Sequence, residues 1–180
     1  MENSDSEILA LFGDMKTREK GFQLLIVKYQ QRIYWQIRKM VNIHEDTDDV
    51  MQNVFIKVWN NLGKFKGNSQ LYTWIYRISV NETLAFLKHR NKRRSISVDE
   101  TEGYFSDRGT EANLGGDEIT LKLEQAIETL PDKQKLVFNM RYYEEMPYEQ
   151  MSQILETSVG ALKASYHHAA KKIESFLTGN

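Results

Sequence analysis

Apolar residues recur at every third or fourth position along almost the whole chain, the spacing that places them on one face of an α-helix. No segment shows the convincing alternation of apolar and polar residues that indicates a half-buried β-strand. The pattern therefore predicts an all-α fold, with helices over residues 5–15, 19–41, 46–61, 69–93, 118–129, 132–144, 148–155 and 158–177.

Local residue types agree with several of the predicted helix starts. Ser4 opens a capping-box motif, and Ser69 and Ser158 are expected to cap later helices, because serine oxygens accept hydrogen bonds from free helix N–H groups. Both prolines of the chain, Pro131 and Pro147, stand where a helix is predicted to begin, a position that tolerates the missing proline N–H.

One segment departs from this pattern. Residues 95–117 hold four glycines and few aliphatic residues, and residues 95–118 carry seven acidic side chains against one basic, for a net charge of −6. This composition predicts a flexible acidic linker. It divides the 180 residues into two small helical domains, an N-terminal helical bundle over residues 1–94 and a C-terminal domain over residues 118–180.

The charge of the whole chain hides a local imbalance. With 24 basic and 25 acidic side chains the formal net charge is −1, which by itself argues against nucleic-acid binding. Between Lys57 and Arg94, however, nine basic residues face a single acid, Glu82. Phosphate binding requires such a basic segment, because displaced counterions supply much of the affinity. The distribution favours a nucleic-acid contact in the N-terminal domain.

The composition also excludes several classes of protein. A chain without cysteine has no disulfide scaffold, thiolate zinc site, iron–sulfur cluster or cysteine nucleophile. The first residues lack the basic and apolar stretches of a secretory signal, and no apolar run approaches the roughly 18–20 residues of a membrane span. We expect a cytoplasmic protein that is not an enzyme and holds neither a metal nor another cofactor.

A cluster of carboxylates, Glu45–Asp49, stands at the start of the third predicted helix. The helix macrodipole favours negative charge there, which accounts for the cluster without any ligand. A metal site that adds His44 is disfavoured, because consecutive helical residues point around the axis. Steps of about 100° per residue place a mainly polar arc opposite the core side of this helix, and the arc resembles a docking face for another helix. The arc holds Asp49, Gln52, Asn53, Ile56 and Asn60, with Asp48 and Trp59 on its edge.

Aromatic and basic residues are interleaved in the fourth predicted helix and the loop before it, namely Phe65, Tyr72, Trp74 and Tyr76 with Lys64, Lys66 and Arg77. Flat rings stack on bases while cations contact the backbone, a combination typical of single-stranded nucleic-acid binding. The alternative is an ordinary core helix with a solvated basic end.

Residues 148–168 have the pattern of a helix-turn-helix, with two predicted helices joined by residues 156–158. Small residues at the start of the second helix would let its backbone enter a major groove, and lysines follow where phosphates would lie. The outward positions are Gly160, Ala161, Ala164, His167, His168, Lys171 and Lys172. The alternative is an ordinary helical hairpin.

In this order, the parts resemble a bacterial RNA polymerase sigma factor of the extracytoplasmic-function (ECF) subgroup of the sigma-seventy family. The resemblance covers nearly the whole chain and is carried by residues 29–34, 45–59, 65–69, 73–78 with Asn81, 130–134 and 158–163. It implies a DNA-binding initiation factor that gives core polymerase its promoter specificity and helps to melt the promoter.

The resemblance also implies a role for each part. The outward arc of the third helix would dock on the coiled-coil clamp of the polymerase β′ subunit. The aromatic and basic segment would open the minus-ten promoter element and hold an extruded base, through Phe65, Lys66, Gly67, Asn68, Ser69, Tyr72, Trp74, Tyr76, Arg77, Asn81, Lys88 and Arg90. The C-terminal domain would contact the β flap and read the minus-thirty-five element as a duplex, through Ser158, Gly160, Ala161, Lys163, Ala164, Ser165, His167, His168, Lys171 and Lys172.

Two positions depart from the family pattern. Glu156 stands in the turn where members usually have glycine, and a non-glycine residue at positive φ costs on the order of 1 kcal/mol. Ser165 stands where many members place arginine. The resemblance leaves open whether an anti-sigma factor is a further partner. The rival hypotheses are a free-standing DNA-binding regulator that uses only the helix-turn-helix, and a small helical enzyme with a metal on the Glu45–Asp49 carboxylates.

Overall fold

A computed structural model describes residues 3–96 and 118–179, and every regular element in these two ranges is helical. The predicted all-α fold is confirmed. The elements are α1 (Asp5–Gly13), α2 (Arg18–Val41), α3 (His44–Asn61), the 3₁₀ turn η1 (Leu62–Lys64), α4 (Leu71–Ile96), α5 (Glu118–Glu128), α6 (Asp132–Tyr142), α7 (Tyr148–Leu155) and α8 (Val159–Thr178).

The chain forms two compact helical units, Met1–Phe86 and Leu87–Asn180, so the division falls within α4. Nearly all of the predicted linker, residues 95–117, lies outside the described residues.

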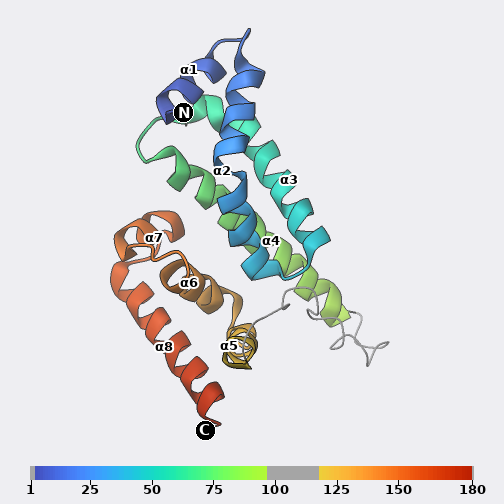
Figure 1. Ribbon diagram of the computed structural model, residues 1–180, viewed down its shortest axis with the longest axis vertical. Coiled ribbons are helices and arrows are strands. Elements are labelled where there is room, and N and C mark those ends of the chain that lie inside the picture. The colour runs from blue at the N-terminus through green and yellow to red at the C-terminus, as the bar shows by residue number, and fades with distance from the viewer. Residues whose placement is uncertain (1–2, 97–117, 180) are drawn as a thin grey trace. The chain divides into compact units, whose positions relative to one another are not determined.

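In the first unit, α1 packs against α2, and α2 lies alongside α3 (Figure 1). Apolar residues at helical spacing supply the core, because each helix turns the same side inward every three to four residues. Buried members include Leu25, Ile33 and Ile37 of α2, Val50, Val54 and Val58 of α3, and Ile75 of α4.

The start of α1 is fixed by polar contacts. Ser4 forms the predicted capping box, in which its hydroxyl accepts from the Glu7 N–H and the Glu7 carboxylate accepts from the Ser4 N–H. Asp5 accepts hydrogen bonds from Lys28 at 2.8 Å and from the Tyr29 hydroxyl at 2.5 Å. Burial works against ionisation of Asp5, but the hydrogen bonds from Lys28 and Tyr29 outweigh it and lower the pKa of this carboxyl.

In the second unit, α8 packs against α5, α6 and α7. The core of this unit gathers Ala126, Ile127, Leu130, Phe138, Ala169 and Ile173. Pro131 and Pro147 directly precede α6 and α7, so both are helix-start residues as predicted. Buried Lys135 pairs with Glu128 at 2.5 Å; burial lowers the pKa of Lys135, and the carboxylate opposes this shift.

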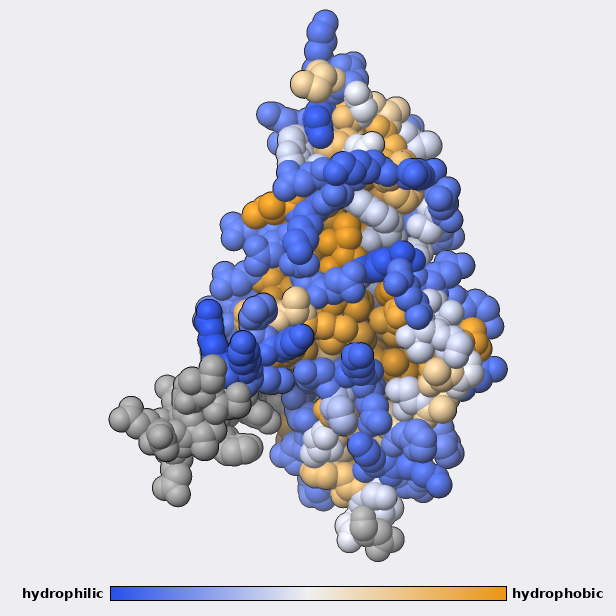
Figure 2. Space-filling model, turned by 180° about the vertical axis from the view of Figure 1, so that it is seen from behind, coloured by the Kyte–Doolittle hydropathy of each residue, from blue (hydrophilic) through white to orange (hydrophobic). Residues whose placement is uncertain are grey.

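Hydrophilic side chains cover most of the face drawn in Figure 2, and apolar side chains reach that surface in smaller areas between them. None of the described helices is both long and apolar enough to cross a bilayer.

Candidate functional site

Helix α3 has one buried side and one solvent-facing side. Thr47, Val50, Val54 and Val58 are buried, whereas the predicted outward positions Asp48, Asp49, Gln52, Asn53 and Ile56 are exposed. The predicted orientation of this helix is therefore confirmed. Ile56 is 51% exposed among short polar side chains, which leaves one apolar anchor in the middle of a polar surface.

Trp59 lies at the end of this outward face and is half-buried. Its ring centroid lies 5.4 Å from that of Phe12 in α1 and 4.9 Å from that of Phe22 in α2, both at steep interplanar angles. Trp59 thus joins the solvent-facing arc to the packing between α1, α2 and α3.

The N-terminus of α3 carries a histidine between two polar partners. The His44 Nδ1 lies 2.8 Å from the Tyr34 hydroxyl, and its Nε2 lies 3.6 Å from the Asp48 carboxylate. Neither here nor elsewhere in the described residues do three or more histidine, aspartate or glutamate side chains gather in a way that could hold a metal ion.

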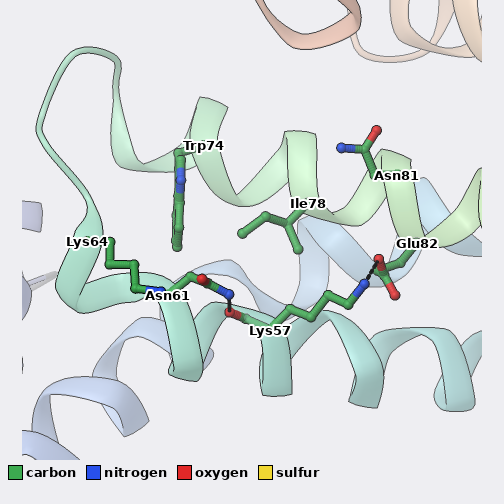
Figure 3. A pocket seen from close by; sticks show the side chains of 7 residues that line it. All are labelled: Lys57, Asn61, Lys64, Trp74, Ile78, Asn81 and Glu82. Atoms are coloured by element: carbon green, nitrogen blue, oxygen red, sulfur yellow. Dashed lines mark hydrogen bonds and ion pairs between the residues drawn. The ribbon is translucent and has the colours of Figure 1, made fainter.

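An open pocket of about 400 Å³ lies between α3 and α4 (Figure 3). Figure 3 shows the Trp74 ring projecting from α4 toward α3, with Ile78 beside it. The lining residues are Lys57, Asn61, Lys64, Trp74, Ile78, Asn81 and Glu82. The pocket therefore combines a flat aromatic ring, amide groups and cations.

The Lys57 and Glu82 side chains close one side of this pocket with an ion pair of 2.5 Å. The amide nitrogen of Asn61 donates to the Lys57 carbonyl oxygen at 2.8 Å, which leaves the Asn61 side-chain oxygen as an acceptor (Figure 3). The Phe65 ring packs on Trp74 with 5.5 Å between centroids. These contacts hold the pocket walls together. The ion pair joins α3 to α4 although Lys57 and Glu82 stand 25 residues apart in the sequence.

The loop before α4 is exposed at Lys66, Gly67 and Asn68, and Gly67 has a φ of +71° that suits glycine. The predicted N-cap role of Ser69 is wrong. The first helical hydrogen bond runs from the Trp74 N–H to the Gln70 carbonyl, and the Ser69 hydroxyl donates to that same carbonyl group instead of accepting from the helix.

Tyr72 and Tyr76 are buried, which corrects the expectation that they lie on an open side of α4. The Tyr72 ring stacks on Tyr29 of α2 at 5.9 Å and lies under the Arg32 guanidinium, while Tyr76 is 0% exposed and meets Tyr72 edge to face. Rings in these positions have no free face for a base.

The remaining predicted residues of α4 differ in accessibility. Asn81 and Lys88 are exposed, and Arg77 and Arg90 are half-buried. Their spacing places Arg77, Asn81 and Lys88 along one side of the helix. Thr73, one turn before Arg77 on the same side, is buried.

In the second unit, α7 and α8 are joined by residues 156–158, so the predicted helix-turn-helix geometry is present. Glu156 ends α7 in the left-handed conformation, with φ of 51° and ψ of 39°. The Ser158 side chain accepts from the Ala161 N–H at 3.3 Å and caps α8 as predicted. The turn keeps its left-handed geometry although it lacks glycine.

The outward side of α8 is open along most of its length. The exposed positions are Gly160, Ala161, Lys163, Ala164, His167, His168, Lys171 and Lys172, whereas Ser165 is half-buried. The Lys172 ammonium donates to the Gln134 side-chain oxygen at 3.1 Å and so also links α8 to α6. Lys171 has no such restraint among the hydrogen bonds of the described residues.

Sequence reasoning missed two residues beside α8. The Tyr148 ring at the start of α7 lies 5.3 Å from the Arg141 guanidinium and 5.7 Å from the Lys163 ammonium. Arg141 also donates to the carbonyls of Glu145 and Met146, which fixes the turn before α7. These residues come from three elements, so no periodic signal in the sequence brings them together.

Two family descriptions match the chain. "Sigma-70 region 2" matches residues 25–93, and "Sigma-70, region 4" matches residues 120–173. The first match contains α3, the pocket and most of α4, and the second contains the helix-turn-helix.

Curated relatives resemble the chain over nearly its full length. The ECF RNA polymerase sigma-E factor of Escherichia coli (strain K12) is 30% identical over 169 residues, which cover 89% of this chain and 88% of that protein. The RNA polymerase sigma-H factor of Pseudomonas aeruginosa is 29% identical over 168 residues, which cover 88% and 87% of the two chains.

Solved structures share the fold at lower identity. The sigma factor RpoE from Bartonella quintana, in complex with the anti-sigma factor NepR, gives a TM-score of 0.72 at 17% identity, covering 88% of this chain and 98% of that one. CnrH, in complex with the cytosolic domain of CnrY, gives a TM-score of 0.69 at 17% identity, covering 99% of each chain.

Proposed function

Since the chain belongs to the ECF sigma factors, non-catalytic subunits that direct promoter-specific transcription initiation, we propose a division of this work among its surfaces. Residues 1–94 bind core polymerase and open the minus-ten element, and residues 118–180 read the minus-thirty-five element. The observation that carries the proposal is the open pocket between α3 and α4, where Trp74 stands among cations and amides.

The outward face of α3 docks on the β′ clamp of core polymerase. It presents Asp48, Asp49, Gln52 and Asn53 around exposed Ile56, with Trp59 at one end. An apolar centre with a polar rim is the usual composition of a protein interface. The short polar side chains lose little conformational entropy on binding, which favours them at such a surface.

The pocket and the neighbouring loop hold the unpaired non-template strand. Extruding a base from the duplex costs a few kcal/mol, and stacking on an aromatic ring returns about 1–3 kcal/mol per base. Trp74 supplies that ring. The buried rings of Tyr72 and Tyr76 do not belong to this surface. The residues that we assign to it are Phe65, Lys66, Gly67, Asn68, Ser69, Trp74, Arg77, Asn81, Lys88 and Arg90.

The outward side of α8 enters the major groove of the minus-thirty-five element. Gly160, Ala161 and Ala164 give a close backbone approach and methyl contacts, His168 offers a ring nitrogen to a base edge, and Lys171 meets the phosphates. The cations around Tyr148 add a second phosphate contact beside α8.

Further partners follow from the same assignment. We propose that the second unit contacts the β flap of core polymerase and that the protein acts in the cytoplasm, where transcription takes place. A solved sigma factor of this fold is bound to an anti-sigma factor, and we propose a partner of that class for this chain.

In vitro transcription with core polymerase on a promoter library tests the proposal. Wild-type protein is expected to give promoter-dependent transcripts that reveal both elements. Trp74→Ala is expected to lower promoter opening, read as 2-aminopurine fluorescence, by about 5- to 150-fold, the range that a stack of 1–3 kcal/mol corresponds to. Core binding should stay unchanged.

Trp35→Ala serves as the matched control, because Trp35 is an exposed tryptophan on α2, outside the pocket. Equal opening by wild-type protein and Trp74→Ala would contradict the role of the pocket. Changing Asp49 and Gln52 together to Ala should instead weaken core binding and leave the helical circular dichroism intact, since both side chains face solvent.

A further inference from the structure

Arg18 stands in a position that local helix energetics disfavour. It is the first residue of α2, where the macrodipole places positive partial charge and so disfavours a cation. No ion pair of the described residues involves Arg18, and its Nε atom is buried without a hydrogen-bond partner. A local conflict of this kind in a natural sequence points to a compensating role.

The compensation is a cluster of aromatic rings. The Arg18 guanidinium carbon lies 4.5 Å from the centroid of the Phe12 ring and 5.1 Å from that of Trp59. Phe12 and Trp59 themselves meet edge to face at 5.4 Å, and Phe22 contacts Trp59 from the α2 side at 4.9 Å. Arg18 is therefore held by two ring faces from two other helices, a cation–π arrangement.

Trp59 connects this cluster to the outward face of α3. It follows Gln52 by seven residues and Ile56 by three, so all three side chains lie on the same side of the helix. Trp59 is half-buried, and its ring packs on the cluster through Phe12 and Phe22. Its orientation is set by Phe12, Arg18 and Phe22.

We propose that Arg18 is a positioning residue for core-polymerase binding, which holds the Trp59 ring in place as the end of the α3 docking face. Helix α1 contributes to that face through Phe12, although α1 lies outside residues 25–93, which match sigma-70 region 2. The inference rests on the proposed docking role of α3.

A double-mutant cycle on the full-length protein tests this inference, with core affinity read from the anisotropy of a labelled chain. Arg18→Ala is expected to weaken core binding about fivefold, the factor that a cation–π contact of about 1 kcal/mol corresponds to. In a Trp59→Ala background the same change should have no further effect, because Arg18 acts through that ring. Arg18→Lys, which keeps the charge but not the planar stack, should fall between wild type and Arg18→Ala.

Two controls separate positioning from folding. Lys20→Ala removes an exposed cation of the same helix and should leave core affinity unchanged. In a chain whose other tryptophans, Trp35 and Trp74, are changed to Phe, Arg18→Ala should make Trp59 more accessible to acrylamide while the far-ultraviolet circular dichroism stays constant.

Two outcomes would overturn the inference and spare the docking role. One is a lower melting temperature for Arg18→Ala with unchanged affinity for core polymerase, which would mean that Arg18 only stabilises the packing of α1. The other is that Arg18→Ala lowers the affinity for core polymerase by the same factor in the wild-type chain and in the Trp59→Ala background. Ile56→Ala distinguishes the remaining case: if this variant binds core polymerase like wild type, the docking role of α3 fails, and the inference fails with it.

Discussion

Helix α2 approaches the backbone of α1 closely at Gly21, and this contact offers a sharp test of the fold. A Cβ atom on Gly21 would lie 2.6 Å from the backbone nitrogen of Phe12 and 3.0 Å from the carbonyl oxygen of Ile8. Both neighbours are backbone atoms, so no side-chain rotation relieves the contact. Restoring an ordinary separation of 3.4 Å requires α1 to move by about 0.8 Å.

Two opposing terms decide the effect of Gly21→Ala. Alanine is the better helix former by about 1 kcal/mol, and this term alone would stabilise α2. Overpacking a closely packed contact costs about 1–3 kcal/mol. The displacement of α1 also disturbs the buried side chains of Ile8 and Phe12 and the hydrogen bonds of Asp5. We expect a net loss of about 1–2 kcal/mol in the free energy of unfolding.

Urea unfolding followed by tryptophan fluorescence measures this loss. All three tryptophans, Trp35, Trp59 and Trp74, lie in the first unit, so the signal reports that unit alone. With a denaturant slope of about 2 kcal/mol/M, the middle of the usual range for urea, the midpoint should fall by roughly 0.5–1 M.

Gly13→Ala is the matched control for this measurement. It makes the same substitution on α1, at a site where a Cβ meets nothing within 4 Å, and should leave the midpoint unchanged or raise it. A higher midpoint for Gly21→Ala would refute the close contact, because helix propensity would then act unopposed.

Three further changes test separate parts of the molecule. Wild-type protein should have a higher free energy of unfolding than Asp5→Asn at pH 7, and this difference should disappear in acid. The folded-state pKa of Asp5 is lowered, so its contribution exists above the ordinary value of 3.8 and is lost as the pH falls through the folded pKa; urea titrations at several pH values measure this. Glu156→Gly should stabilise the second unit by up to about 1 kcal/mol in thermal circular dichroism, because glycine adopts the left-handed turn without strain. Lys171→Ala should reduce the salt dependence of duplex binding by about one unit of slope in anisotropy titrations, and an unchanged slope would contradict a phosphate contact.

The sequence predicted the helices well because each of them turns one apolar stripe inward. The outward face of α3 followed from the same periodicity, since all of its buried positions except Thr47 are aliphatic or aromatic. Strain at Glu156 was predicted from the resemblance, because members of the family usually have glycine in this turn, and its positive φ agrees with that prediction. The helices and the outward face depend only on local spacing, which a single sequence contains.

The two misplaced tyrosines show where local spacing is insufficient. Tyr72 and Tyr76 were assigned to strand binding because aromatic rings interleaved with cations suit bases, but the two tyrosines share a helical stripe with Ser79 and Thr83. In the structure, the Ser79 hydroxyl donates to the Gln36 side chain of α2, and all four residues are buried. Burial of a polar stripe needs polar partners on another helix. Such partners stand 43 residues away in the sequence and have no local signature.

For the same reason, the pocket and the packing of Trp59 could not be predicted from the sequence, because both depend on contacts between helices. Ile56 and Lys57 are adjacent in sequence, so their side chains diverge by about 100° around α3. Ile56 lies on the docking face, whereas Lys57 and Asn61, one turn later, form a wall of the pocket. The Lys57–Glu82 ion pair then joins this wall to α4, and Trp59 joins the other edge of α3 to α1. One helix therefore carries both proposed surfaces. Because a helix transmits displacement as a nearly rigid body, the proposed polymerase contact on one side of α3 would also fix the position of the pocket that we propose receives the strand on the other side.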